Sequence, residues 1–159
     1  MIDFVYRAVL IGIGATALLD LWVLGLHYVL KTPGANWRPV GRWFCHIAKG
    51  KVLHEDIANA KPFRHELAIG WIGHYVIGIL FAAILLSIVP KGWSVQPTLA
   101  PAMLVGIVTI GAGWFILQPA MGGGIAALKR PNANQIRLMS VAGHIVFGLG
   151  LYFSALLIR

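Results

Sequence analysis

Apolar residues run along this chain in four long blocks that are separated by polar or proline-containing segments. The blocks cover residues 8–30, residues 67–89, the charge-free stretch between Lys91 and Lys129, and residues 138–158. About 20 consecutive apolar residues are enough for a helix to cross the hydrocarbon core of a bilayer. None of the blocks shows the strict alternation that is typical of a half-buried strand. The pattern therefore predicts an all-α integral membrane protein, a bundle of four transmembrane helices.

The composition supports this prediction. Charged residues make up 11 % of the chain and hydrophobic residues 58 %, whereas a soluble domain has about 25 % charged residues. The single cysteine, Cys45, excludes an internal disulfide and a zinc motif built on paired cysteines. We expect one membrane domain that covers residues 1–159.

The lysine and arginine residues lie mostly on one side of the predicted membrane. Seven of the 13 fall in the connection 31–66 and three in the connection 129–137. The remaining three are Arg7, Lys91 and Arg159. The positive-inside rule therefore places both connections in the cytoplasm and both termini outside. The net charge of +8 then needs no nucleic acid to explain it, and a bilayer with anionic headgroups is the expected partner.

The long connection 31–66 carries a helical pattern of its own. Over residues 38–51 a proline stands near the start, Gly50 near the end, and apolar residues recur at steps of three and four. The pattern predicts a short amphipathic helix that lies in the headgroup plane. A second short helix is expected at about residues 54–60. The residues that we expect at the membrane surface are Trp37, Arg38, Arg42 and Trp43.

Two short segments of the sequence recur in similar form. LKTPGAN (30–36) is echoed by LKRPNAN (128–134), and GHYVIG (73–78) is echoed by GHIVFG (143–148). The echoes predict two tandem helix pairs related by an axis along the membrane normal. The first repeat would cover about residues 5–90 and include the connection 31–66, and the second about residues 97–159.

Four polar residues interrupt the apolar blocks and define a candidate ligand site. Asp20 and Gln118 each lie ten residues before the cytoplasmic end of a span, roughly 15 Å deep, and His74 and His144 lie roughly 10 Å deep from the same side. A carboxylate near the membrane centre costs about 2.5–3.5 kcal/mol on insertion scales. Intramembrane ionisable groups are therefore read as functional by default. The alternative is a buried polar network that only fixes helix packing.

The histidines also suggest a cofactor. His46, His54, His74 and His144 are candidate ligands for a divalent metal, because imidazole suits Zn, Fe or Ni. No tight motif such as HExxH is present, so such a site would be assembled from distant positions. The sharper option is a b-type haem held between His74 and His144.

The motifs resemble an uncharacterised family of bacterial inner-membrane proteins, the domain of unknown function 2938. They are IGxGATAxxD (11–20), NWRPVGRWFCH (36–46), GWIGHY (70–75), QPAMGGGIAA (118–127) and GHIVFGLGLY (143–152). The resemblance covers nearly the whole chain, and it implies a location in the bacterial inner membrane and no particular activity.

The leading hypothesis for the function is accordingly a multi-pass binding or transport protein that engages a small ligand or ion. The first alternative is a redox protein that binds haem b or a metal through His74 and His144. The second is a structural or assembly subunit without a ligand. Neither enzymatic activity nor a homo-oligomer is decided by the sequence.

Overall fold

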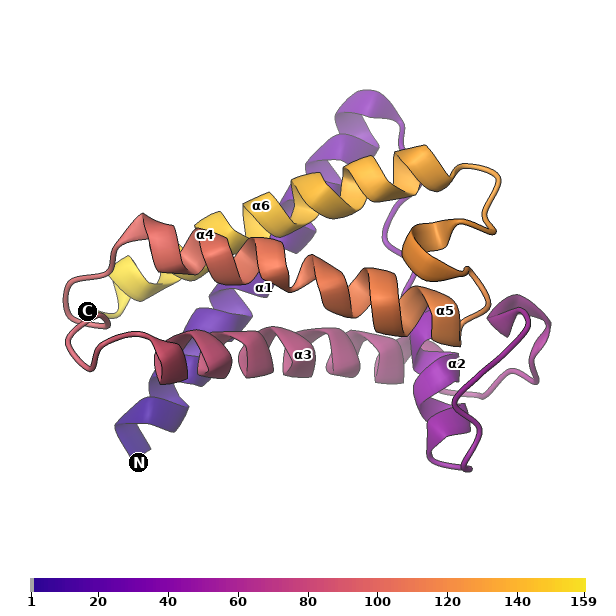
Figure 1. Cartoon of the computed structure of the whole chain (residues 1–159), viewed down its shortest axis with the longest axis horizontal. Helices are drawn as coiled ribbons and strands as arrows, with labels where there is room; N and C mark the ends of the chain where they lie inside the picture. Colours follow the sequence, from indigo (N-terminus) through magenta and orange to yellow (C-terminus); the bar gives the residue numbers. More distant parts are fainter. Residues whose placement is uncertain (1) are drawn as a thin grey trace. The chain divides into compact units, whose positions relative to one another are not determined.

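The computed structural model describes residues 2–159, and within that range the chain is helical with no β-strand. The all-α prediction is therefore confirmed. In chain order the elements are α1 (Ile2–Leu30), α2 (Arg38–Ile47), η1 (Ile57–Asn59), α3 (Glu66–Ile88), α4 (Leu99–Val108), η2 (Ala112–Leu117), α5 (Gln118–Ala120), η3 (Ile125–Ala127) and α6 (Ala133–Leu157) (Figure 1).

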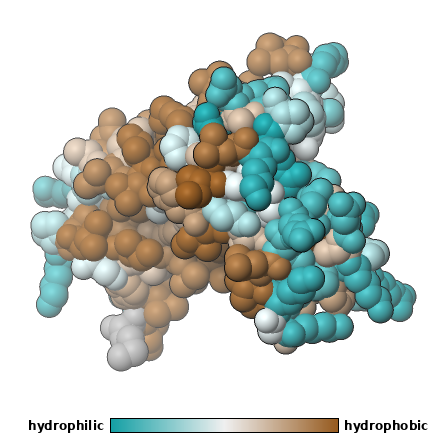
Figure 2. Space-filling view, turned by 45° about the vertical axis from the view of Figure 1, so that its right-hand side comes forward, coloured by the Kyte–Doolittle hydropathy of each residue, from teal (hydrophilic) through white to brown (hydrophobic). Residues whose placement is uncertain are grey.

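Four helical stretches in the described chain are long and apolar enough to cross a membrane. They are Ile2–Leu30, Glu66–Ile88, Leu99–Ala120 and Ala133–Leu157. Many of their large apolar side chains are exposed, as at Leu21, Leu80 and Leu104, and Figure 2 shows broad apolar patches on the visible surface. Such surface is matched by lipid rather than by water. The four predicted spans are thus confirmed, and the chain is a multi-pass membrane protein.

By its internal contacts the chain divides into two compact units. Unit 1 consists of Met1–Ala35, Tyr75–Thr109 and Ala142–Arg159, and unit 2 consists of Asn36–His74 and Ile110–Val141. Each unit has a hydrophobic cluster of its own. The single domain expected from the sequence stays a prediction.

Unit 1 is packed through small residues. Its core contains Ile11, Ala15, Leu85 and Leu151, all of them fully buried. A Cβ added to Gly12 of α1 would overlap the backbone of Ile79 in α3. The helices can approach this closely because glycine lacks a side chain, which is the usual basis of helix association in lipid.

A second close contact of the same kind joins α4 and α6. A Cβ on Gly106 would lie 2.7 Å from the Cα of Gly148. The echo of GHYVIG and GHIVFG aligns Gly148 with Gly78, and a Cβ on Gly78 would overlap Thr16 of α1. Both echoed glycines therefore stand where two helices touch. The tandem repeat itself stays a prediction.

In unit 2 the amphipathic helix is shorter than the pattern predicts. Helix α2 ends at Ile47 rather than near residue 51. The N–H of Gly50 donates to the carbonyl of Ile47, and the N–H of Lys51 donates to that of His46. Gly50 has a φ of 79°, so this is a Schellman ending in which glycine takes the left-handed position. The second helix expected at residues 54–60 is a single 3₁₀ turn, Ile57–Asn59.

The third span ends in irregular backbone. Its last turns form a π-helix, Ala112–Leu117, which is followed by the short α5 and a turn through Gly122 and Gly124, both at positive φ. Pro119 has no N–H to donate, so a regular helix could not continue through it with all its hydrogen bonds. The regular α-helix of the third span is therefore interrupted before its end.

Candidate functional site

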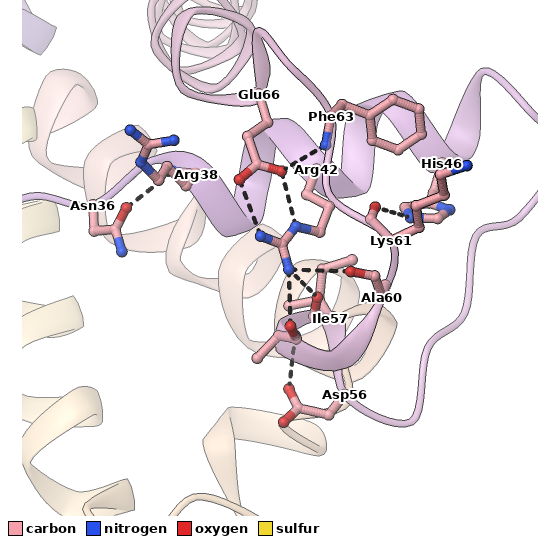
Figure 3. A network of polar contacts seen from close by, with 11 residues as sticks. Asn36, Arg38, Arg42, His46, Asp56, Ile57, Ala60, Lys61, Phe63 and Glu66 are labelled. Atoms are coloured by element: carbon pink, nitrogen blue, oxygen red, sulfur yellow. Dashed lines mark hydrogen bonds and ion pairs between the residues drawn. The ribbon is translucent and has the colours of Figure 1, made fainter.

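An ion pair in unit 2 connects α2 to the start of α3 (Figure 3). The Arg42 Nε donates to Glu66 Oε2 at 2.9 Å, and a second guanidinium nitrogen donates to Oε1 at 3.0 Å. The Glu66 side chain is only 4 % exposed and that of Arg42 is 16 % exposed. The backbone N–H of Phe63 also donates to Glu66. The pair is thus bidentate and largely removed from solvent, the geometry in which arginine binds a carboxylate most strongly.

The same guanidinium organises the segment that follows α2. Its third nitrogen donates to the carbonyl oxygens of Ile57, Ala58 and Ala60, at 3.1, 2.8 and 3.2 Å. Hydrogen bonding to Glu66 raises the pKa of Arg42 above its usual value. The charged guanidinium thus holds residues 57–60 against α2 through these three hydrogen bonds.

This connection is also attached to the end of the third span. The N–H of His54 donates to the carbonyl of Ala120 at 2.9 Å, and that of Ile57 donates to Met121 at 3.1 Å. A Cβ on Gly122 would overlap the carbonyl of Glu55, so only glycine fits there. The segment after α2 is consequently hydrogen-bonded to the end of α5 and packed against the turn that follows it, all within unit 2.

Two of the candidate metal ligands meet in this structure. The ring centroids of His46 and His54 are 4.8 Å apart, with an angle of 70° between the planes. His54 is 8 % exposed, and neither of its ring nitrogens has a hydrogen-bond partner among the described residues. The Nε2 of His46 lies 3.1 Å from the carbonyl oxygen of Lys61. Within residues 2–159, no group of three or more histidine, cysteine, aspartate or glutamate side chains could hold a metal ion.

His74 lies among tryptophans in unit 2. Its ring stacks on Trp37 with centroids 3.9 Å apart and an angle of 22°, and Trp71 approaches edge-on at 5.9 Å. The indole Nε1 of Trp37 is buried without a partner in the described chain. The sequence predicts Trp37 at the membrane surface, and no pattern in it indicates the stacking on His74.

Asp20 has a partner in unit 1 that sequence reasoning missed. The Tyr75 hydroxyl donates to Asp20 Oδ2 at 3.0 Å, which connects α1 to α3. Tyr75 directly follows His74 in GWIGHY, and a phenol inside an apolar block was the available signal. His144 lies half-buried on α6, next to Gly143, which is packed near Leu19 of α1.

The four residues of the predicted ligand site are divided between the units. Asp20 and His144 belong to unit 1, and His74 and Gln118 belong to unit 2. Gln118 begins α5, with its side-chain oxygen against Gly123. The convergence of all four side chains stays a prediction.

The four residues expected at the membrane surface have different environments. Arg38 is exposed. Trp43 is 8 % exposed and donates its indole N–H to the carbonyl of Val52 at 2.8 Å, so it is held inside unit 2. Arg42 is bonded to Glu66 and Trp37 stacks on His74, as described above. Contact of these residues with headgroups stays a prediction.

An open groove of about 860 Å³ lies in unit 1 between the end of α3 and the start of α4. It is lined mainly by apolar residues, with Trp93, Gln96 and Thr98 as its polar members. The Trp93 indole donates to the Thr98 hydroxyl at 3.1 Å. None of the residues predicted from the sequence as ligand or metal site lines this groove.

Comparison with known proteins identifies a family but no activity. No curated protein and no solved structure matches the chain. The family described as protein of unknown function, DUF2938, has a model that matches residues 9–158. That range contains all five motifs on which the resemblance was based. Because the match covers nearly the whole chain, the protein belongs to the DUF2938 family.

Proposed function

We propose that the protein is a binding or transport protein of the bacterial inner membrane, and that it engages a small cation or cationic ligand through Asp20. The observation that carries the proposal is the hydrogen bond from Tyr75 to Asp20 between two membrane-spanning helices. Asp20 lies ten residues before the end of α1, roughly 15 Å along the helix from Leu30. An ionisable group at that depth is costly to insert and is normally kept for an ion or substrate pathway.

The chemistry of the pair suits a positively charged ligand. A carboxylate offers only acceptors, and the Tyr75 oxygen can accept a second hydrogen bond while its O–H points at Asp20. A cation at this position would bind the carboxylate of Asp20 directly. His74, Gln118 and His144 are the further polar groups that we assign to the pathway. In this proposal the connections 31–66 and 129–137 face the cytoplasm, where exposed basic residues such as Arg38 meet anionic headgroups.

Thermal unfolding in detergent tests the proposal. The parent protein is titrated with Na⁺, K⁺, Mg²⁺ and ammonium, and the unfolding midpoint is followed. A ligand at about 100 times its dissociation constant adds about 2.7 kcal/mol, which is about 5–10 °C for a chain of this size. We expect at least one cation to raise the midpoint by this amount, and we expect Asp20→Asn to abolish the rise.

The matched control is Asp3→Asn, the same substitution on the same helix, where the carboxylate is exposed and pairs with Arg7. It should leave the rise intact. The proposal fails if no cation shifts the parent, or if Asp20→Asn responds as the parent does. A Soret band that disappears in His74→Ala or His144→Ala would instead support the haem hypothesis. Lower stability of Asp20→Asn without any ligand effect would support a purely structural role.

A further inference from the structure

We propose that His46 and His54 form a binding site for a divalent first-row metal ion of the zinc type. The first support is the separation of the two rings, 4.8 Å between centroids. With metal–nitrogen distances of about 2.0–2.1 Å, the centroids of two imidazoles on one tetrahedral ion lie about 5 Å apart. The two rings thus already have the spacing that a shared ion requires.

The hydrogen bond of His46 fixes which of its nitrogens is available. A carbonyl oxygen can only accept, so the contact between Nε2 and the Lys61 carbonyl requires the proton on Nε2 (Figure 3). In the neutral ring Nδ1 then carries the lone pair. Histidines that bind metals usually donate their other N–H to a carbonyl or carboxylate in this way, which sets the tautomer and the ring orientation.

His54 supplies the second, independent observation. The residue is 8 % exposed, and within the described residues both of its ring nitrogens are buried without a partner. Buried polar groups are normally hydrogen-bonded, and a buried exception is accounted for by strain, by a catalytic role, or by a bound water or ion. A metal ion held by one nitrogen of His54 would satisfy that nitrogen.

Both rings are held by backbone that has little freedom. His46 lies in the last turn of α2, next to the Schellman ending. His54 is anchored through its own N–H to Ala120. The ring of Phe63 packs edge-on against His46 at 5.1 Å, and the Lys49 ammonium lies over that phenyl ring, 4.7 Å from its centroid. Pre-positioned ligands of this kind lower the cost of ordering a site on binding.

The donor set decides the class of metal. Imidazole nitrogen suits zinc, nickel and copper, whereas magnesium and calcium prefer oxygen ligands. With two protein ligands, the other positions of a tetrahedral ion are left to water or an exogenous ligand. The site should therefore bind zinc more weakly than a closed four-ligand site, and the metal should exchange. This assignment does not depend on Asp20 and stands or falls separately from the proposed transport role.

The test measures zinc binding to the full chain purified through a tag that contains no histidine. His46→Gln keeps an N–H donor for the Lys61 carbonyl and removes the Nδ1 ligand. His54→Phe keeps an aromatic ring in the buried position and removes both nitrogens. His65→Gln is the matched control, because His65 lies in the same connection with an exposed side chain. Unfolding midpoints of all variants verify that each is folded.

We expect the parent to bind about one zinc ion per chain and each of the two variants to bind it at least about tenfold more weakly. His65→Gln should match the parent, and Mg²⁺ should not compete. Co²⁺ added to the parent should give the visible absorption of a tetrahedral site, and this absorption should be absent in His46→Gln. The proposal is overturned if the parent binds no zinc, if His46→Gln binds as the parent does, or if His65→Gln loses binding equally.

Discussion

The elements inside unit 1 and the elements inside unit 2 are held together by different kinds of contact. In unit 1 the helices touch through glycine and alanine, and backbone meets backbone at Gly12 and Gly106. In unit 2 the elements are connected by a buried arginine, which makes five hydrogen bonds to a carboxylate and to backbone carbonyls. The difference follows from what each unit contains: regular apolar helices in unit 1, and irregular backbone with polar groups in unit 2. Lipid competes with apolar side chains for contact, so helices gain from closer approach, whereas irregular backbone needs hydrogen-bond partners.

The contrast teaches that the two units have different weak points. A methyl group added at a helix contact should damage unit 1. The loss of one charge should damage unit 2. Four substitutions, taken from the largest expected effect to the smallest, put this contrast to the test.

Arg42→Met should cost unit 2 the most, about 3–5 kcal/mol, because it leaves the Glu66 carboxylate buried without its partner. The free energy of unfolding in detergent measures the loss. Arg38→Met, on the exposed side of the same helix, is the control and should change little. The double variant Arg42→Met with Glu66→Gln should recover part of the loss. If it were no more stable than Arg42→Met alone, the buried charge would not be the cause.

Gly12→Ala should cost unit 1 about 1–3 kcal/mol, because the new methyl group meets the backbone of Ile79, which cannot move aside alone. Gly25→Ala is the matched control on α1, since nothing lies within 4 Å of a Cβ at that position. It should be neutral or stabilising by up to about 1 kcal/mol, because alanine favours a helix over glycine. Equal effects of the two substitutions on the unfolding free energy would contradict close packing at Gly12.

Tyr75→Phe removes the hydrogen bond to Asp20 and leaves the ring in place. Hydrogen bonds between membrane helices are worth about 0.6 kcal/mol on average and at most about 1.7 kcal/mol. We expect a loss of unfolding free energy in this range. A loss well above this range would mean that the Tyr75 hydroxyl stabilises unit 1 through further interactions besides this hydrogen bond. Asp20→Ala combined with Tyr75→Phe, in a double-mutant cycle, isolates the pair, because alanine leaves no acceptor for the hydroxyl.

Arg130→Gln should have the smallest effect, below about 1 kcal/mol. The ion pair between Arg130 and Asp56 is 3.3 Å long, and each side chain is about one-third exposed. Water and salt screen such a pair. The small loss should shrink further as the salt concentration rises, which unfolding at two ionic strengths can measure. A loss of stability as large as that of Arg42→Met would show that the difference in burial between the two ion pairs does not determine their contributions to stability.

Much of the fold could be predicted from sequence because a membrane imposes simple rules. Apolar length alone located the four spans. Gly50 marked the end of the amphipathic segment, although α2 itself ends at Ile47. The π-helix before Pro119 was not predicted, because no residue preference separates it from an α-helix.

The partners of the polar residues were much harder to predict. The amphipathic pattern predicts Arg42 and Trp43 at the membrane surface. Their bonds to Glu66 and Val52 depend on how the connection folds back, which periodicity does not encode. His46 and His54 were both proposed as metal ligands, yet their spacing gave no reason to expect contact. Side chains that meet through irregular backbone leave no regular interval in the sequence.

The attachment of His54 and Ile57 to Ala120 and Met121 has a consequence for biosynthesis. The acceptor for the His54 amide is made 66 residues later, so at about 5–20 residues per second the first connection waits about 3–13 s for it. A segment that emerges early on the ribosome is thus completed late, after the third span has been synthesised. A nascent chain arrested before residue 120 should therefore expose this connection to protease, whereas release of the full chain should close it.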